Sequence, residues 1–109
     1  MSEKPWKAYN ATATGARPGL VPTLTRTLLD GSKRSVKFDG VQGDTLIDRK
    51  RSVCSMPRAK AQTFRQSEVL SQHNLVAVWE VPDKKQLVAA RRLLRKLRVG
   101  NIRARMVEP

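Results

Sequence analysis

The stretch "LVAVWEVPDKKQLVAARRLLRKLRVGNIRARM" (residues 75–106) decides the fold expected for this chain. Its first seven residues are almost entirely apolar at both alternating sets of positions, which is typical of a strand covered on both faces. Pro82 and Asp83 then end the strand and begin a helix, because Asp83 can accept hydrogen bonds from the free N–H groups of a first helical turn. The chain is therefore expected to pass from a central strand into a helix.

The helix after Asp83 is predicted to be strongly amphipathic. At about 100° of rotation per residue, one stripe collects the apolar residues Leu87, Ala90, Leu93, Leu94 and Leu97. Gly100 is the predicted stop of this helix, and "NIRARMV" (101–107) is predicted to be the next strand, with Arg103 and Arg105 on one face. Residues 75–107 thus form a predicted strand–helix–strand unit, in a parallel or split crossover.

Upstream, two shorter segments predict an antiparallel hairpin. "TLTRTLL" (23–29) and "RSVKFDGV" (34–41) flank the turn sequence "DGSK". "TLIDRKRSVCSM" (45–56) is a further predicted strand, and 58–74 is predicted to be a loop with a short helical turn. We therefore predict a small single α+β domain over residues 23–109.

Residues 1–22 predict a flexible basic arm, because they combine prolines and glycines with no periodic apolar pattern. In the arm, aromatic side chains are expected to stack or insert while basic ones meet phosphates. The arm residues expected to contact nucleic acid are Lys4, Trp6, Lys7, Tyr9 and Arg17.

The charge of the chain points to a polyanionic partner. Lys and Arg number 22 against 9 Asp and Glu, so the net charge is +13, which is costly for a compact chain that does not face phosphate or anionic lipid. Arginine outnumbers lysine six to three in 75–109, which favours bidentate phosphate contacts. The predicted nucleic-acid-binding residues are Lys84, Lys85, Arg91, Arg92, Arg95, Lys96, Arg98, Arg103 and Arg105.

Sequence signatures of enzymes are absent. The glycines form no phosphate-binding loop, and there is no nucleophile elbow or zinc-ligand spacing. Asp39, Asp44 and Asp48 lie close in sequence and could hold the magnesium ion of a nuclease, but we interpret them as turn residues. The lone Cys54 excludes an internal disulfide. We therefore expect a non-enzymatic protein with no cofactor and no metal.

The stretch "VWEVPDKKQLVAARRLLRKLRVGNIRARMV" (78–107) resembles the strand–helix–strand half-units of a family of large-subunit ribosomal proteins. The resemblance covers about a third of the chain. It implies a basic helix between two strands, and binding to ribosomal RNA.

These patterns favour an RNA-binding structural protein, a component of a ribosome or similar ribonucleoprotein whose basic helix face contacts RNA phosphates beside neighbouring proteins. The sequence shows no helix-turn-helix, zinc-finger or basic-zipper pattern and no aromatic pattern of an RNA recognition motif. With few aromatic residues, contacts to backbone and shape are expected to dominate, as in proteins embedded in folded RNA. The alternative is a coat or nucleocapsid protein of a small RNA virus or phage, which would self-assemble as a homo-oligomer. A third class is a basic subunit of a membrane-associated complex. No apolar run is long enough to span a bilayer. We expect an intracellular location, cytoplasmic or organellar, or a virion for the coat protein.

Overall fold

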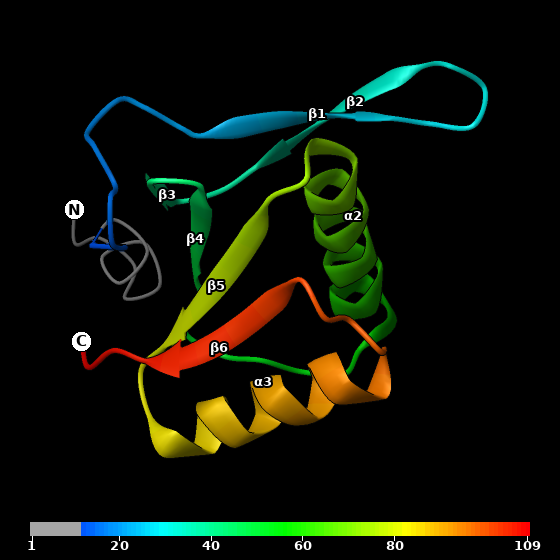
Figure 1. The fold of residues 1–109 in the computed structure, drawn as a ribbon. Coiled ribbons are helices and arrows are strands. Elements are labelled where there is room, and N and C mark those ends of the chain that lie inside the picture. Colours follow the sequence, from blue (N-terminus) through cyan, green and yellow to red (C-terminus); the bar gives the residue numbers. More distant parts are fainter. Residues whose placement is uncertain (1–11) are drawn as a thin grey trace, which may run out of the picture.

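A computed structural model describes residues 12–109 of the chain as an α+β fold (Figure 1). A two-stranded antiparallel sheet pairs β1 with β2, and a four-stranded sheet has the order β3-β4-β5-β6. In the larger sheet β3 is antiparallel to β4, and β4, β5 and β6 are parallel. The predicted hairpin and the C-terminal strand–helix–strand unit are both confirmed. The elements are β1 (Thr23–Thr27), β2 (Lys33–Lys37), β3 (Gly40–Gln42), β4 (Thr45–Arg49), α2 (Pro57–His73), β5 (Val76–Val81), α3 (Lys84–Lys96) and β6 (Ile102–Met106).

The central strand is β5, as predicted, and its two faces meet different surroundings. Trp79 is 1% exposed and packs in the main apolar cluster, to which both α2 and α3 contribute. Asp48 and Ala104 are its register partners in β4 and β6, so all three lie on the helix-covered face. Glu80, the next residue, lies on the opposite face together with its partners Arg49 and Arg105. The sheet therefore separates a helix-covered face from a second, polar one.

The segment 58–74 is a helix, so the predicted loop is wrong. Helix α2 has 17 residues and begins with Pro57, whose fixed φ and missing N–H suit the first helical position. Its buried side chains are Thr63, Gln66, Val69 and Leu70, spaced by three and four residues. Because half of this buried stripe is polar, the apolar pattern of the sequence does not reveal the helix.

Helix α3 begins where the sequence indicates and ends earlier. The Asp83 side chain accepts a hydrogen bond from the Gln86 N–H at 2.8 Å, as expected of a helix cap. The helix ends at Lys96, and Arg98, with a φ of 57°, takes the left-handed conformation predicted for the stop at Gly100. The stop is displaced because the Val99 N–H bonds to the Leu94 carbonyl, and Val99 then packs against the core.

The region 40–56 also differs from its prediction. The turn-rich stretch "GVQGD" contains β3, which pairs with β4 around Gly43, whose φ is +59°. Strand β4 covers only 45–49 of the predicted strand, and residues 50–56 continue without regular structure toward α2. This irregular segment lies beside the first turns of α2, where it helps to form a pocket.

Part of the predicted arm packs on the sheet. Thr14 lies so close to β3 that a Cβ atom on Gly40 would stand 2.2 Å from the Thr14 carbonyl oxygen. Gly15, with a φ of +76°, approaches the Val41 carbonyl oxygen in the same way. Glycine is needed at both positions because any side chain would collide with backbone. Residues 12–16 thus cross the polar face of the sheet.

Candidate functional site

Two acidic side chains meet at one end of the large sheet. Asp39 lies in the link between β2 and β3, and Asp48 lies in β4. The backbone positions Asp39, since its N–H donates to the Ile47 carbonyl at 3.0 Å and its Oδ2 accepts from the Arg49 N–H at 2.8 Å. The Asp39 and Asp48 carboxyl groups lie near enough for Asp48 to raise the pKa of Asp39. A half-buried acid and a buried one are therefore neighbours at this end of the sheet.

This contact changes the acidity of the pair. Burial raises the pKa of Asp39 to about 7, and the hydrogen bond to Asp48 and the Asp48 charge contribute to the rise. The Arg49 N–H and the Lys50 charge act in the opposite direction. Near neutral pH Asp39 is thus close to the midpoint of its titration, and a cation placed beside it would favour its ionised form.

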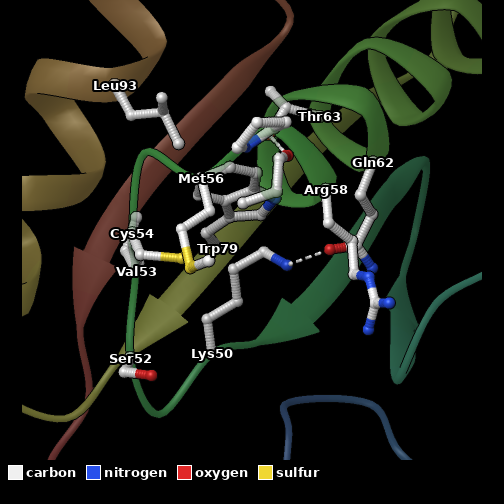
Figure 2. Close-up of a pocket in the computed structure, with 12 residues that line it drawn as sticks. Lys50, Ser52, Val53, Cys54, Met56, Arg58, Gln62, Thr63, Trp79 and Leu93 are labelled. Carbon is white, nitrogen blue, oxygen red and sulfur yellow. Dashed lines mark hydrogen bonds between the residues drawn. The ribbon is translucent and has the colours of Figure 1, made fainter.

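Lys50 provides a positive charge at this pair. It follows Asp48 by two residues along an extended backbone, so the two side chains project from the same face. Its Nζ lies 3.0 Å from Asp48 Oδ2 and donates to Gln62 Oε1 at 3.4 Å (Figure 2). The ammonium group also stands 4.7 Å from the centre of the Trp79 ring. The lysine is therefore held in one place by an acid, an amide and an aromatic ring.

Helix α2 fixes the orientation of Asp48. Gln66 is 1% exposed, and its Nε2 donates to Asp48 Oδ2 at 2.9 Å. Its Oε1 accepts from Trp79 Nε1 at 2.9 Å, and because an indole N–H can only donate, this bond determines which way the amide points. We call Asp39, Asp48, Lys50 and Gln66 the carboxylate site. Its members come from the β2–β3 link, from β4 and the residue after it, and from α2.

The ligands available here suit a hard cation that is only partly bound by protein. Within 12–109 no group of three or more His, Cys, Asp or Glu side chains is placed to hold a metal ion. Mg²⁺ is commonly bound through one or two carboxylates, with water and substrate phosphates completing its shell. The Asp39–Asp48 pair fits this second pattern.

A pocket of about 560 Å³ opens beside Lys50 (Figure 2). Lys50 and Gln62 belong to its wall, so the pocket adjoins the carboxylate site directly. The irregular segment after β4, the first turns of α2, Trp79 of β5 and Leu93 of α3 enclose it. The lining residues are Lys50, Ser52, Val53, Cys54, Met56, Pro57, Arg58, Ala59, Gln62, Thr63, Trp79 and Leu93.

The basic residues predicted to bind nucleic acid are exposed but are not all on one surface. Seven of them lie on or just after α3, and none forms an ion pair with a residue of 12–109. Arg103 and Arg105 lie on the polar face of β6, the face that α3 does not cover. The seven are Lys84, Lys85, Arg91, Arg92, Arg95, Lys96 and Arg98. The predicted surface is thus divided by the sheet.

Of the predicted arm contacts, only Arg17 can be placed. It is exposed and forms a short antiparallel bridge with Leu20. Lys4, Trp6, Lys7 and Tyr9 lie outside the described residues.

Arg105 belongs to a buried ion cluster that we call the Glu80 clamp, formed by Thr14, Arg49, Glu80 and Arg105. The fully buried Glu80 accepts from Arg49 Nε at 2.7 Å, from Arg105 Nε at 3.0 Å and from the Thr14 hydroxyl at 2.7 Å. Burial opposes the ionisation of Glu80, yet the hydrogen bonds from Thr14, Arg105 and Arg49 lower its pKa to about 2. The clamp holds residues 12–14 against β4, β5 and β6.

The sequence suggested only part of the carboxylate site. Asp44 is an exposed residue of the β3–β4 turn, in agreement with its interpretation as a turn residue. That interpretation is wrong for Asp48, which is a strand residue with 8% exposure. One available signal was the spacing of Asp48 and Lys50, which places an acid and a base on the same face of a strand. The closeness of Asp39 and Asp48 in sequence was a second signal, but nothing in the sequence indicated that Gln66 would join them.

The stability of the fold is expected to fall as the pH rises from about 4 to about 7, because of Asp39. In this window the folded protein keeps a proton on Asp39 that the unfolded chain, with an ordinary Asp pKa of 3.8, has released. Asp39→Asn mimics the protonated acid and should remove most of this dependence. Urea unfolding at several pH values measures the free energy of unfolding of both proteins. An equal pH dependence in the parent chain and in Asp39→Asn would contradict a raised pKa of Asp39.

Comparison of the chain with known protein families, with curated proteins and with solved structures gives no match in any of the three. The likeness of 78–107 to ribosomal half-units therefore remains a similarity of pattern. None of the helices within 12–109 combines the length and apolar character needed to cross a bilayer.

Proposed function

We propose that this chain is a divalent-metal-dependent hydrolase of phosphodiester bonds in nucleic acid, with the carboxylate site as its reacting centre. The observation that supports it is the neighbouring acids Asp39 and Asp48, with Lys50 Nζ 3.0 Å from Asp48 Oδ2 and Gln66 Nε2 2.9 Å from the same oxygen. A purely structural pair of acids would be costly to hold in contact, whereas a pair that receives a cation gains from the same geometry.

Each residue has a definable task in this reaction. Asp39 and Asp48 would hold the cation, which supplies Lewis acidity toward a phosphoryl oxygen when bound. Gln66 keeps the Asp48 carboxylate oriented, and Lys50 places positive charge beside the phosphate. In the hydrolysis a water oxygen forms a bond to phosphorus and the bond from phosphorus to one ester oxygen breaks. The water proton goes to solvent, the leaving oxygen takes up a proton, and a phosphomonoester and an alcohol result.

The net charge of +13 supports a nucleic acid as substrate, because a basic protein concentrates a polyanion around itself. Exposed basic residues lie near the site: Arg58 lines the adjoining pocket, and Lys37 and Arg65 line a second pocket that includes Gln66. The sequence alone favours a non-enzymatic function because it carries no enzyme signature and the aspartates are interpreted as turn residues.

A cleavage assay tests this function. The full chain is incubated with single-stranded and duplex DNA and with RNA, in Mg²⁺, in Mn²⁺ or in EDTA, and products are resolved on denaturing gels. We expect cleavage of at least one substrate in a divalent metal and none in EDTA. Asp48→Asn, purified in the same way, controls for contaminating nucleases and should be inactive. Absence of cleavage in both metals, or equal cleavage by Asp48→Asn, would refute the function.

A second candidate function is non-enzymatic RNA binding in a ribonucleoprotein, through the basic face of α3. The observation that favours it is the exposure of seven basic residues there without an ion-pair partner in 12–109. An exposed helix face normally gains from mixed charges, so this one-sided charge favours an external phosphate backbone.

The salt dependence of RNA binding tests this second function. Replacing Arg91, Arg92 and Arg95 by glutamine should flatten the slope of log affinity against log salt by about 3, or nearly one per lost phosphate contact. An unchanged slope would exclude the α3 face. Light scattering separates the coat-protein alternative, which requires particles or dimers of the isolated chain.

A further inference from the structure

The pocket beside Lys50 has the composition of a site for a flat heteroaromatic ring. Val53, Met56 and Leu93 give it apolar walls, and part of its lining is the indole of Trp79 (Figure 2). The lining also carries polar side chains, and two of them, the Lys50 ammonium and the Gln62 amide, meet at one side. Small-molecule pockets of this kind have apolar walls and a few fixed polar groups that set orientation. Its volume of about 560 Å³ lies within the usual range of such pockets.

The position of the pocket ties its ligand to the carboxylate site. Lys50 contacts Asp48 in that site and lines the pocket with the same side chain. A ligand inside is therefore the immediate neighbour of any phosphate held at Asp39 and Asp48. Arg58 is exposed at the rim, where Figure 2 shows its guanidinium directed away from the apolar walls. An apolar pocket between two cationic groups suits a nucleotide, in which an uncharged ring is flanked by phosphates.

Building on the proposed function, we infer that this pocket binds one unstacked nucleobase of the substrate strand, next to the phosphate that is cleaved. A base inside a duplex is paired and stacked, and extruding it costs a few kcal/mol. Single-stranded nucleic acid offers the base without that cost, so it is the preferred substrate class. Single-stranded DNA and single-stranded RNA both offer an unstacked base beside a phosphate. Parallel binding measurements with oligothymidylate and oligouridylate determine which of the two the pocket prefers.

Filling the pocket from α2 tests the inference. Ala59 lines the pocket, whereas Ala61, two residues along the same helix, is exposed and outside it. Ala59→Phe should occupy the space for the base and weaken binding of single-stranded oligonucleotides about tenfold, since stacking is worth roughly 1–3 kcal/mol per base. Ala61→Phe makes the same chemical change outside the pocket and should bind like the parent chain. Affinities are measured by fluorescence anisotropy in EDTA, which prevents cleavage.

An abasic oligonucleotide provides a test that needs no variant. It carries the same phosphates as oligothymidylate without bases, and the parent chain should bind it about tenfold more weakly. Ala59→Phe should bind the two equally. Equal affinity of the parent chain for both oligonucleotides, or for single strand and duplex, would overturn the inference. Binding in EDTA does not depend on catalysis, so a failed cleavage assay and a failed pocket test are distinct outcomes.

Discussion

Lys50→Met is expected to slow phosphodiester cleavage about hundredfold or more, because it removes the positive charge beside Asp48 while keeping an unbranched apolar chain on the Trp79 ring. Single-turnover rates with excess enzyme in Mg²⁺ measure the effect on the chemical step. Lys60→Met, the same substitution on α2 away from the carboxylate site, is the matched control and should cleave at the parent rate.

Slower cleavage by Lys50→Met must be distinguished from loss of the folded state. Lys50 forms an ion pair with Asp48, and its side chain is only 15% exposed. Some loss of folding stability is therefore expected in Lys50→Met. Circular dichroism and a melting curve establish that the variant is folded at the assay temperature. A folded Lys50→Met protein that cleaves within about threefold of the parent rate would exclude Lys50 from the reaction. Lys50→Arg retains the charge and should be less impaired.

Glu80→Ala is expected to lower the free energy of unfolding by about 3–5 kcal/mol, because it removes the buried carboxylate that forms ion pairs with Arg49 and Arg105. In the folded protein the Arg49 side chain is 5% exposed and Glu80 is fully buried, so water cannot replace the lost contact. Urea unfolding measures the change. Glu68→Ala is the control: its carboxylate is half exposed and 3.8 Å from Arg26, which predicts a loss below about 1 kcal/mol.

The pH profile of the same proteins gives an independent check on the Glu80 clamp. The Glu80 pKa is lowered from 4.5 to about 2 by hydrogen bonds that outweigh burial. Its contribution to stability is thus fully present above about pH 4.5 and is lost as the pH falls toward 2. The parent chain should lose stability more steeply than Glu80→Ala over this range. Parallel profiles would mean that the clamp does not depend on an ionised Glu80.

The sequence predicted those parts of the fold whose burial follows a simple period. Within residues 75–106, β5 is a continuous apolar run, α3 has one apolar stripe at helical spacing and β6 alternates apolar with basic residues, so all three could be located from the pattern alone. Helix α2 could not, because it buries Thr63 and Gln66, which a hydrophobicity pattern counts as surface residues. Gln66 is buried because its amide bonds at both ends, to Asp48 and to Trp79.

The candidate site was harder to predict because it depends on tertiary contacts. Asp39 and Asp48 are nine positions apart and meet only because the β3–β4 hairpin turns the chain back on itself. The raised pKa of Asp39 arises from its nearness to Asp48 and from burial. Neither can be read from the neighbouring residues in the sequence. The composition of the sequence predicted a basic surface. Only the register of β6 shows that Arg103 and Arg105 lie on the opposite face of the sheet from the basic residues of α3.

The Glu80 clamp also constrains the order in which the chain can fold. It joins Thr14 to Arg105 across 91 positions of sequence and needs β4, β5 and β6 already aligned. Contacts between such distant residues form late, because the long intervening loop must first be closed at an entropic cost. Interactions absent from the folding transition state affect mainly the unfolding rate, so we expect the Glu80 clamp to slow unfolding more than it speeds folding.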